Sequence, residues 1–212
     1  MTTASWALLV ATALTAIVDW IAVARGWARV EYAAKPLTMV GLLGVALTID
    51  PAYSDMRAAF VIALACSLVG DVFLMLPRDR FVAGLAAFLA SHLAYTAGFL
   101  LGPGSVGGLA IGALITAVVA VPFGVHVVRA VRRSAPAIVT PVAAYIVVIS
   151  VMVASATGLG NAWAIVGAWL FFVSDALIGE TRFVRPLRAG SLAIIVTYHV
   201  GQALLVVSLV SR

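Results

Sequence analysis

The stretch VGGLAIGALITAVVAVPFGV, residues 106–125, decides the fold class of this chain. Its twenty residues include no charged side chain, and a helix of that length crosses the roughly 30 Å hydrocarbon core of a bilayer. A helix on the surface of a soluble protein would keep one polar face, whereas this stretch is apolar all round. It therefore predicts a transmembrane helix.

The composition of the whole chain extends this prediction. The 212 residues are 64% hydrophobic and 10% charged, whereas a soluble domain carries about 25% charged residues. The chain thus has too little polar surface for a soluble globule, and we expect an all-α polytopic membrane protein with one domain over residues 1–212. The expected spans are residues 5–24, 36–50, 57–76, 81–101, 106–127, 136–156, 160–179 and 189–210.

The basic residues of the connectors predict the orientation. Of the 13 Lys and Arg residues, eleven fall on one side of the predicted membrane and two, Arg57 and Arg212, on the other. The positive-inside rule then places both termini outside the cytoplasm and predicts a multi-pass protein of the plasma membrane. No basic stripe is interleaved with aromatic residues, which argues against nucleic-acid binding. Trp6, Trp20 and two further tryptophans near span ends are expected to anchor the interfaces.

Three aspartates lie inside predicted spans, where an unpaired charge costs several kcal/mol. Asp19, Asp71 and Asp175 each precede the cytoplasmic end of their helix by five or six residues, which is roughly 8 Å of depth. At this shared depth they could line one cavity that opens inward. Asp19 has an alternative interpretation, because it could instead snorkel to the interface or pair with Arg25.

Further polar residues follow helical stripes beside the aspartates. They are Ser67, Ser91, His92, Tyr95, Ser174, Tyr198, His199 and Gln202. Such residues build interhelical hydrogen bonds in many membrane proteins, so a purely structural role stays open. The histidines are expected about 17 Å deep and the aspartates about 8 Å, an offset too large for one metal ion with bonds near 2 Å. We therefore expect neither a metal nor another cofactor.

Lys35 is the single lysine of the chain and directly precedes Pro36. The proline suits the first turn of the second helix, which would place Lys35 at the cytoplasmic interface. The lysine then either sets the orientation or contacts a lipid phosphate.

Several of these stretches together resemble the YhhN-like lysoplasmalogenases. They are KPLTM (35–39), SLVGDVFLM (67–75), FVAG (81–84), FLASHLAY (88–95), GAWLFFVSD (167–175) and YHVGQ (198–202). These stretches occur in this order along the chain and lie in the second to fourth and in the seventh and eighth predicted spans. Asp19 lies outside these stretches, and His199 departs from the aromatic or small residue expected after Tyr198.

The resemblance implies a membrane hydrolase that cleaves the vinyl ether bond of lysoplasmalogens into a fatty aldehyde and a glycerophospho-head group. Such hydrolysis needs a general acid, an anion and a positioned water. Asp71 and Asp175 are the expected acid–base pair, and either of the two could be the acid. The residues expected to position substrate and water are Lys35, at the phosphate, and Ser67, His92, Tyr95, Ser174, Tyr198, His199 and Gln202.

The resemblance also implies a lysophospholipid substrate and contacts with membrane lipids. Two other functions remain open from the residues alone. Eight spans with buried polar groups suit a proton-coupled transporter, although the spans lack a pair of Gly/Pro-interrupted half-helices. The same polar groups could also belong to a non-catalytic lipid-binding or assembly protein. The oligomeric state is left open.

Overall fold

The computed structural model describes residues 1–210 and folds them into eight long helices and a short 3-10 helix. The elements are α1 (Thr3–Arg25), α2 (Ala28–Thr48), α3 (Ser54–Met75), α4 (Phe81–Leu101), α5 (Val106–Ser134), η1 (Pro136–Ile138), α6 (Val139–Leu159), α7 (Ala162–Phe183) and α8 (Gly190–Val207). All eight long helices are apolar enough to cross a membrane. The all-α, eight-span fold predicted from the sequence is confirmed.

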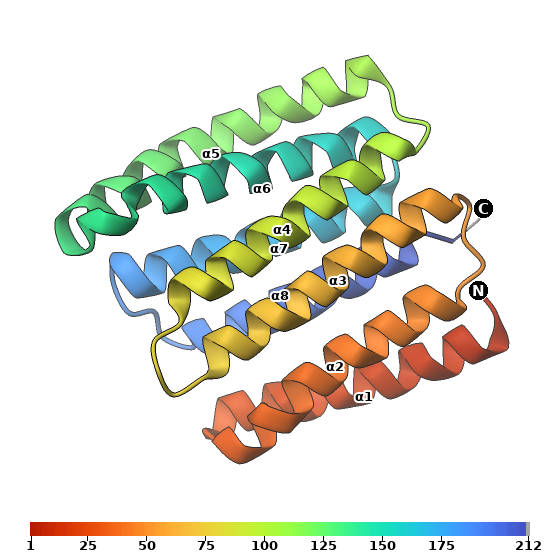
Figure 1. Cartoon of the computed structure of the whole chain (residues 1–212), viewed down its shortest axis with the longest axis horizontal. Coiled ribbons are helices and arrows are strands. Elements are labelled where there is room, and N and C mark those ends of the chain that lie inside the picture. Colours follow the sequence, from red (N-terminus) through yellow and green to blue (C-terminus); the bar gives the residue numbers. More distant parts are fainter. Residues whose placement is uncertain (211–212) are drawn as a thin grey trace.

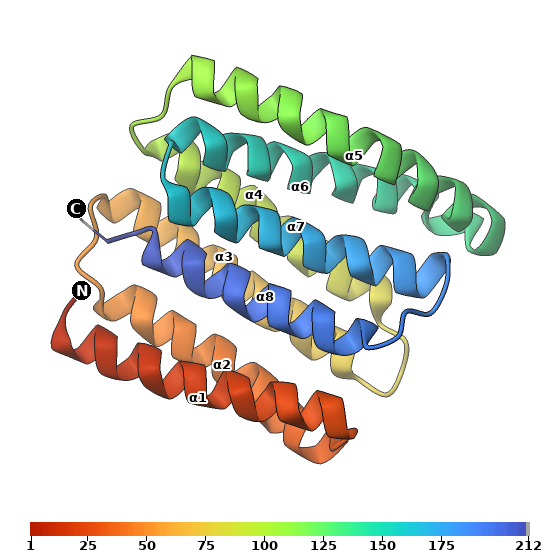
Figure 2. The ribbon, with the colours of Figure 1, turned by 180° about the vertical axis from the view of Figure 1, so that it is seen from behind.

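Consecutive helices pack as antiparallel pairs, because each connection between them is short. The pairs α3/α4 and α7/α8 form the middle of the bundle (Figure 1). The pair α1/α2 lies at one edge against α8 and α3, and α5/α6 lies at the other edge against α4 and α7 (Figure 2). The polar residues of the candidate site therefore gather between the central pairs.

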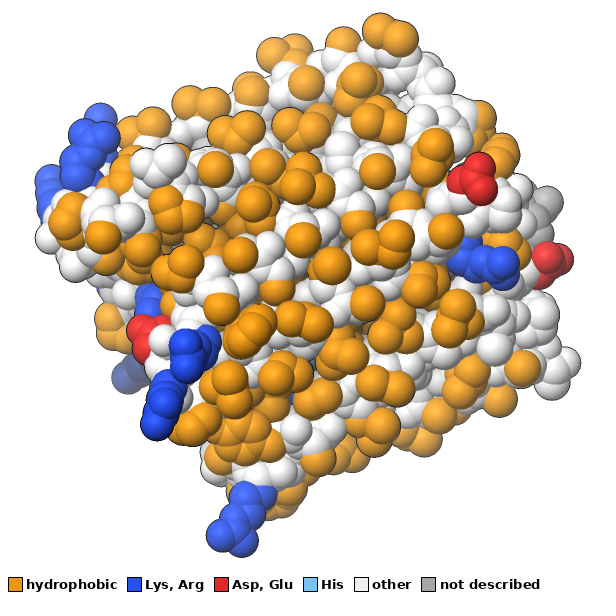
Figure 3. Space-filling model, in the orientation of Figure 1, with side chains coloured by type: hydrophobic (Ala, Val, Ile, Leu, Met, Phe, Trp, Pro, Cys, Tyr) orange, Lys and Arg blue, Asp and Glu red, His pale blue; other side chains and the backbone are white. Residues whose placement is uncertain are grey.

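The two ends of the bundle differ in charge. The Lys and Arg side chains gather mainly at the end that holds the α1–α2, α3–α4, α5–α6 and α7–α8 connections, here named the basic end (Figure 3). Both ends of the described chain lie at the opposite end, beside the α2–α3 connection: the Thr2 hydroxyl donates to the carbonyl of Thr48 at 3.0 Å, and the Ala52 amide donates to that of Leu209 at 2.9 Å. Between the ends the surface is largely apolar, as lipid contact requires.

The start of the second helix corrects the prediction from the sequence. Gly26 turns the chain in the left-handed conformation (φ 68°), and α2 begins at Ala28, so Pro36 lies inside the helix rather than in its first turn. Residues 28–35 are mostly good helix formers, and Glu31 in the first turn suits the positive end of the helix dipole. These residues are too polar to count as a span, which is why hydropathy placed the start eight residues late.

Helix α5 also exceeds the predicted span, which ended at residue 127. It continues to Ser134 and carries Arg132 and Arg133 in its last turn. Cations there stabilise the negative end of the helix dipole, so the helix extends past the apolar core. This extension creates a basic surface beside the end of α7.

Small residues allow the closest contacts between the central helices. A Cβ atom on Gly167 of α7 would lie 2.9 Å from the carbonyl oxygen of Gly201 on α8. A Cβ atom on Gly70 of α3 would lie 2.7 Å from the ring of Phe88 on α4. The missing side chains therefore let α7 approach α8 and let Phe88 lie flat against α3.

Candidate active site

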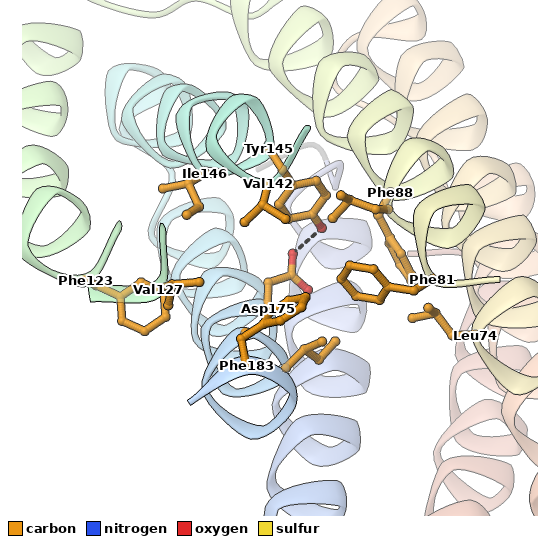
Figure 4. A pocket seen from close by; sticks show the side chains of 13 residues that line it. Leu74, Phe81, Phe88, Phe123, Val127, Val142, Tyr145, Ile146, Asp175 and Phe183 are labelled. Carbon is orange, nitrogen blue, oxygen red and sulfur yellow. Dashed lines mark hydrogen bonds between the residues drawn. The ribbon is translucent and has the colours of Figure 1, made fainter. Parts of the chain in front are cut away.

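Asp175 on α7 is the single charged residue of a narrow, mainly apolar cavity between α3, α4, α5, α6 and α7. The cavity volume is about 60 Å³, enough for a few water molecules or a short stretch of alkyl chain. Figure 4 shows the carboxylate surrounded by aromatic and aliphatic side chains, with Tyr145 pointing towards it. An acidic group in such surroundings is a strong candidate for chemistry.

Two side chains from other helices lie beside the Asp175 carboxylate. The Tyr145 hydroxyl from α6 donates a hydrogen bond to Oδ2 at 2.6 Å, and His92 Nε2 from α4 lies 3.5 Å from the same atom. The His92 ring is fully buried, packs against the rings of Tyr145 and Phe171, and has no hydrogen-bond partner for either nitrogen. A polar ring buried in this way has capacity left for a water or a substrate atom.

Asp71 on α3 has a different set of partners. Its Oδ1 lies 3.1 Å from the Lys35 ammonium of α2, and its Oδ2 accepts a hydrogen bond from the Tyr198 hydroxyl of α8 at 2.6 Å. The carboxylate is almost fully buried, and the lysine side chain is 14% exposed. An ammonium at this distance stabilises the ionised carboxylate, so Asp71 and Lys35 form a buried ion pair.

A hydrogen-bonded chain of neutral groups runs beside Asp71. The Tyr95 hydroxyl donates to Gln202 Oε1 at 2.5 Å, the Gln202 amide donates to Ser67 Oγ at 2.9 Å, and Ser67 Oγ lies 2.7 Å from Ser91 Oγ. These residues come from three helices that the sequence separates by up to 135 positions. The network fixes how α3, α4 and α8 meet.

Asp71 and Asp19 are not among the residues that line the Asp175 cavity, so this cavity is not the common one expected from the sequence. Phe88 lines the Asp175 cavity and also contacts the ring of Tyr198, the hydrogen-bond donor to Asp71. Phe171 packs edge-on against both Phe88 and Tyr198. Phe88 and Phe171, here called the aromatic wall, thus pack between the Tyr198 donor of Asp71 and the Asp175 cavity, and the two carboxylates have different partners.

Asp19 forms a third cluster on the far side of α8. It is fully buried, and neither carboxylate oxygen has a hydrogen-bond partner. His199 Nδ1 lies 4.0 Å from Oδ2 and accepts a hydrogen bond from Trp20 Nε1 at 3.2 Å. The predicted snorkelling or pairing with Arg25 is therefore wrong, because this helix face turns towards α8. Trp20 likewise points inward instead of anchoring the interface.

The contacts of the histidines also correct the depth argument made from the sequence. His92 and His199 come within 4.0 Å of aspartates that were expected to lie about 9 Å nearer the interface. Depth along a helix follows residue number only if all helices stand upright and end in one plane, and these helices are staggered. Among residues 1–210, no group of three or more His, Cys, Asp or Glu side chains could hold a metal ion.

Two further candidates lie elsewhere than expected. Lys35 faces Asp71 in the interior and is not a free interfacial cation. The Ser174 hydroxyl donates a hydrogen bond to the carbonyl of Ile194 at 3.0 Å. This bond joins α7 to α8, so the Ser174 hydroxyl is engaged there and not by the Asp175 carboxylate. Tyr145 was missed by the sequence analysis. Its signal is a tyrosine two turns inside the start of α6, where an unpaired hydroxyl would be costly.

An exposed ion pair between Arg182 and Asp79 lies next to the Asp175 cavity at the basic end. The Arg182 guanidinium lies 4.1 Å over the ring of Phe81, which lines the cavity, and donates to Asp79 Oδ2 at 2.6 Å. The Phe81 amide, which donates to Asp79 Oδ1, and the Arg182 guanidinium hold the pKa of this exposed carboxyl below its ordinary value. The Arg182–Asp79 ion pair thus connects the α3–α4 connection to the end of α7.

Fold and site together define a polytopic helical membrane protein whose buried aspartates meet tyrosine, histidine and lysine side chains. The chain belongs to the YhhN family, because residues 30–209 match the model of that family. Asp19 and Trp20 lie outside the matched residues. No solved structure matches the chain.

Curated relatives include both named enzymes and a bacterial membrane protein. The human lysoplasmalogenase TMEM86B is 34% identical over 148 residues, which are 69% of this chain and 61% of the human protein. A lysoplasmalogenase of Mycobacterium bovis is 31% identical over an alignment of 179 positions, which covers 79% of this chain and 66% of the relative. The membrane protein YhhN of Escherichia coli O157:H7 is 28% identical over an alignment of 217 positions, which covers 94% of this chain and 97% of that protein. The match thus spans about three fifths of the human relative.

Proposed function

We propose that this protein is a membrane hydrolase that cleaves the vinyl ether bond of lysoplasmalogens. The observation that carries the proposal is the Asp175 carboxylate in an apolar, water-sized cavity within a family whose named relatives are lysoplasmalogenases. The substrate is a lysophospholipid that reaches the site from the surrounding membrane lipids.

Asp175 is the general acid in this proposal. Its carboxyl proton moves to the alkene carbon that is not bonded to the ether oxygen. The positive charge then rests on the other alkene carbon, which is bonded to that oxygen. A water adds to that carbon and returns a proton to the Asp175 carboxylate. The hemiacetal so formed breaks its bond to the glycerol oxygen and gives a fatty aldehyde and a glycerophospho-head group, with one water consumed.

The neighbouring groups have supporting roles. Tyr145 orients the carboxyl through its 2.6 Å hydrogen bond, and the free nitrogens of His92 can hold the water. Asp71, ionised beside Lys35, supplies negative charge behind the aromatic wall of Phe88. Charge placed in advance in a low-dielectric site stabilises a cationic transition state without reorganisation.

The Tyr95, Gln202, Ser67 and Ser91 network, with Tyr198 on Asp71, keeps this charge in position. His199 acts one step further away, because its nearest carboxylate is that of Asp19. These assignments rest on contacts between side chains and on the chemistry of each group.

The orientation and location are part of the proposal. Eleven of the 13 basic residues favour a cytoplasmic basic end and termini outside the cytoplasm, in the plasma membrane. Reporter fusions at the N-terminus and in the α5–α6 connection, with membrane fractionation, test this topology. A reporter in the α5–α6 connection that responds as an external one would contradict it.

A mass-spectrometric assay of the purified full chain in neutral detergent tests the reaction. Choline and ethanolamine lysoplasmalogens are compared with the 1-acyl lysolipids of the same chain length. The expected result is release of fatty aldehyde from the vinyl ethers and no fatty acid from the acyl lipids. Absence of aldehyde, or equal cleavage of both lipid types, would overturn the proposal.

A further inference from the structure

A basic groove lies beside the Asp175 cavity at the basic end. It has a volume of about 440 Å³ and runs between the last turns of α5 and the end of α7. Its polar lining comes from His126, Arg129, Arg133 and Ser134, and its apolar wall includes Phe183. These five residues define what we call the arginine groove.

The spacing on α5 aims the basic side chains at this groove. Residues 126, 129 and 133 follow the three- and four-residue spacing that places side chains on one helix face. Arg132 is equally basic and exposed but lies about 100° around the helix from Arg133, outside the groove. The groove therefore contains the guanidinium groups of Arg129 and Arg133, whereas Arg132 lies outside it.

The charge of these arginines is not used within the described chain. Arg182 pairs with Asp79 and Arg185 with Glu180, whereas Arg129 and Arg133 pair with no acid in residues 1–210. His126 lies 3.1 Å from Glu180, which leaves the two arginines as the available cations. Guanidinium groups bind phosphate oxygens in forked, charge-assisted pairs.

The groove also lies at the right distance from the proposed chemistry. Phe183 lines both the groove and the Asp175 cavity, and the eight residues from Asp175 to Phe183 span about 12 Å along α7. Seven bonds separate the phosphorus of a lysoplasmalogen from the vinyl carbon that takes the proton, which is about 8 Å when extended. The arginine and aspartate side chains cover the remaining length.

We propose that the arginine groove binds the phosphate of the lysolipid substrate while its vinyl ether lies beside Asp175. This assignment rests on the proposed hydrolase function, and it replaces Lys35 as the phosphate ligand, because Lys35 is engaged by Asp71. The headgroup then stays at the membrane surface and the alkenyl chain enters between the helices. The groove thereby selects for phospholipid over neutral alkenyl glycerol.

The test compares two substrates in a phosphate-free detergent. One is choline lysoplasmalogen, and the other is the 1-alkenyl glycerol that lacks the phosphate. The measured quantity is the kcat/KM for choline lysoplasmalogen divided by the kcat/KM for the 1-alkenyl glycerol. In the Arg129→Gln/Arg133→Gln variant this ratio falls by about tenfold, whereas in Arg132→Gln it stays at the wild-type value. All three side chains are exposed, and a thermal unfolding curve confirms that each variant is folded.

The outcomes separate the inference from the function beneath it. An unchanged ratio in the double variant overturns the groove as the phosphate site. An equal fall in Arg132→Gln also overturns it, because general surface charge would then explain the selectivity. If the wild-type chain releases aldehyde from neither substrate, the hydrolase proposal fails instead.

Discussion

The buried Lys35–Asp71 pair gives the sharpest prediction for stability. Replacing Lys35 by Met leaves a carboxylate whose side chain is 2% exposed without its cation. Removing one partner of a buried pair costs about 3–5 kcal/mol, and the Tyr198 hydrogen bond that remains favours the lower end. We expect Lys35→Met to lower the free energy of unfolding by about 3 kcal/mol.

A second substitution distinguishes lost charge balance from lost packing. In Lys35→Met/Asp71→Asn the buried charge is gone, and the amide oxygen still accepts from Tyr198. We expect this variant to lie within about 1 kcal/mol of the wild type. Arg185→Gln is the control, because it removes one partner of a pair whose arginine is 74% exposed and should change stability by less than about 1 kcal/mol.

Unfolding by sodium dodecyl sulfate in mixed micelles, followed by circular dichroism, gives these free energies. If Lys35→Met is as stable as Arg185→Gln, the ion pair does not stabilise the fold and the reasoning is refuted. If the double variant is less stable than Lys35→Met, the loss comes from packing and not from an unbalanced charge.

Two further substitutions test the packing and the site. Gly167→Ala places a Cβ atom 2.9 Å from the backbone oxygen of Gly201, which cannot move aside, so it should destabilise the fold by about 1–3 kcal/mol. In the control Gly107→Ala the new Cβ meets no atom within 4 Å, and the same unfolding assay should show no loss of stability. Tyr145→Phe removes the hydrogen bond to Asp175 and should slow vinyl ether cleavage about tenfold in a single-turnover assay, with little change in stability. An unaltered rate would exclude Tyr145 from the site.

The number and order of the helices could be predicted because lipid imposes one simple requirement on each span. The starts and ends were less accurate where a helix continues through polar residues, as at Ala28 and Ser134. Hydropathy reports where the chain is apolar, and a helix can extend beyond that region into the interface.

The site residues could be named from the sequence, but their pairing could not. Intramembrane Asp71 and Asp175 stand out because burial of a carboxylate is costly. Their partners Lys35 and Tyr145 depend on the stagger and rotation of helices about their axes, which no single sequence pattern specifies. The same stagger brings His92 beside Asp175 against the estimate from residue depth.

The single-turnover rate of aldehyde release by Asp175→Asn tests the central claim most directly. Asparagine keeps the shape but cannot donate an acidic proton, so the rate should fall by about 10²-fold or more. Asp19→Asn is the control, since it neutralises an aspartate that is even more deeply buried (0% against 11% side-chain exposure) but lies outside the cavity, and it should stay within about threefold of the wild type. A folded Asp175→Asn protein that releases aldehyde as fast as Asp19→Asn would contradict the account.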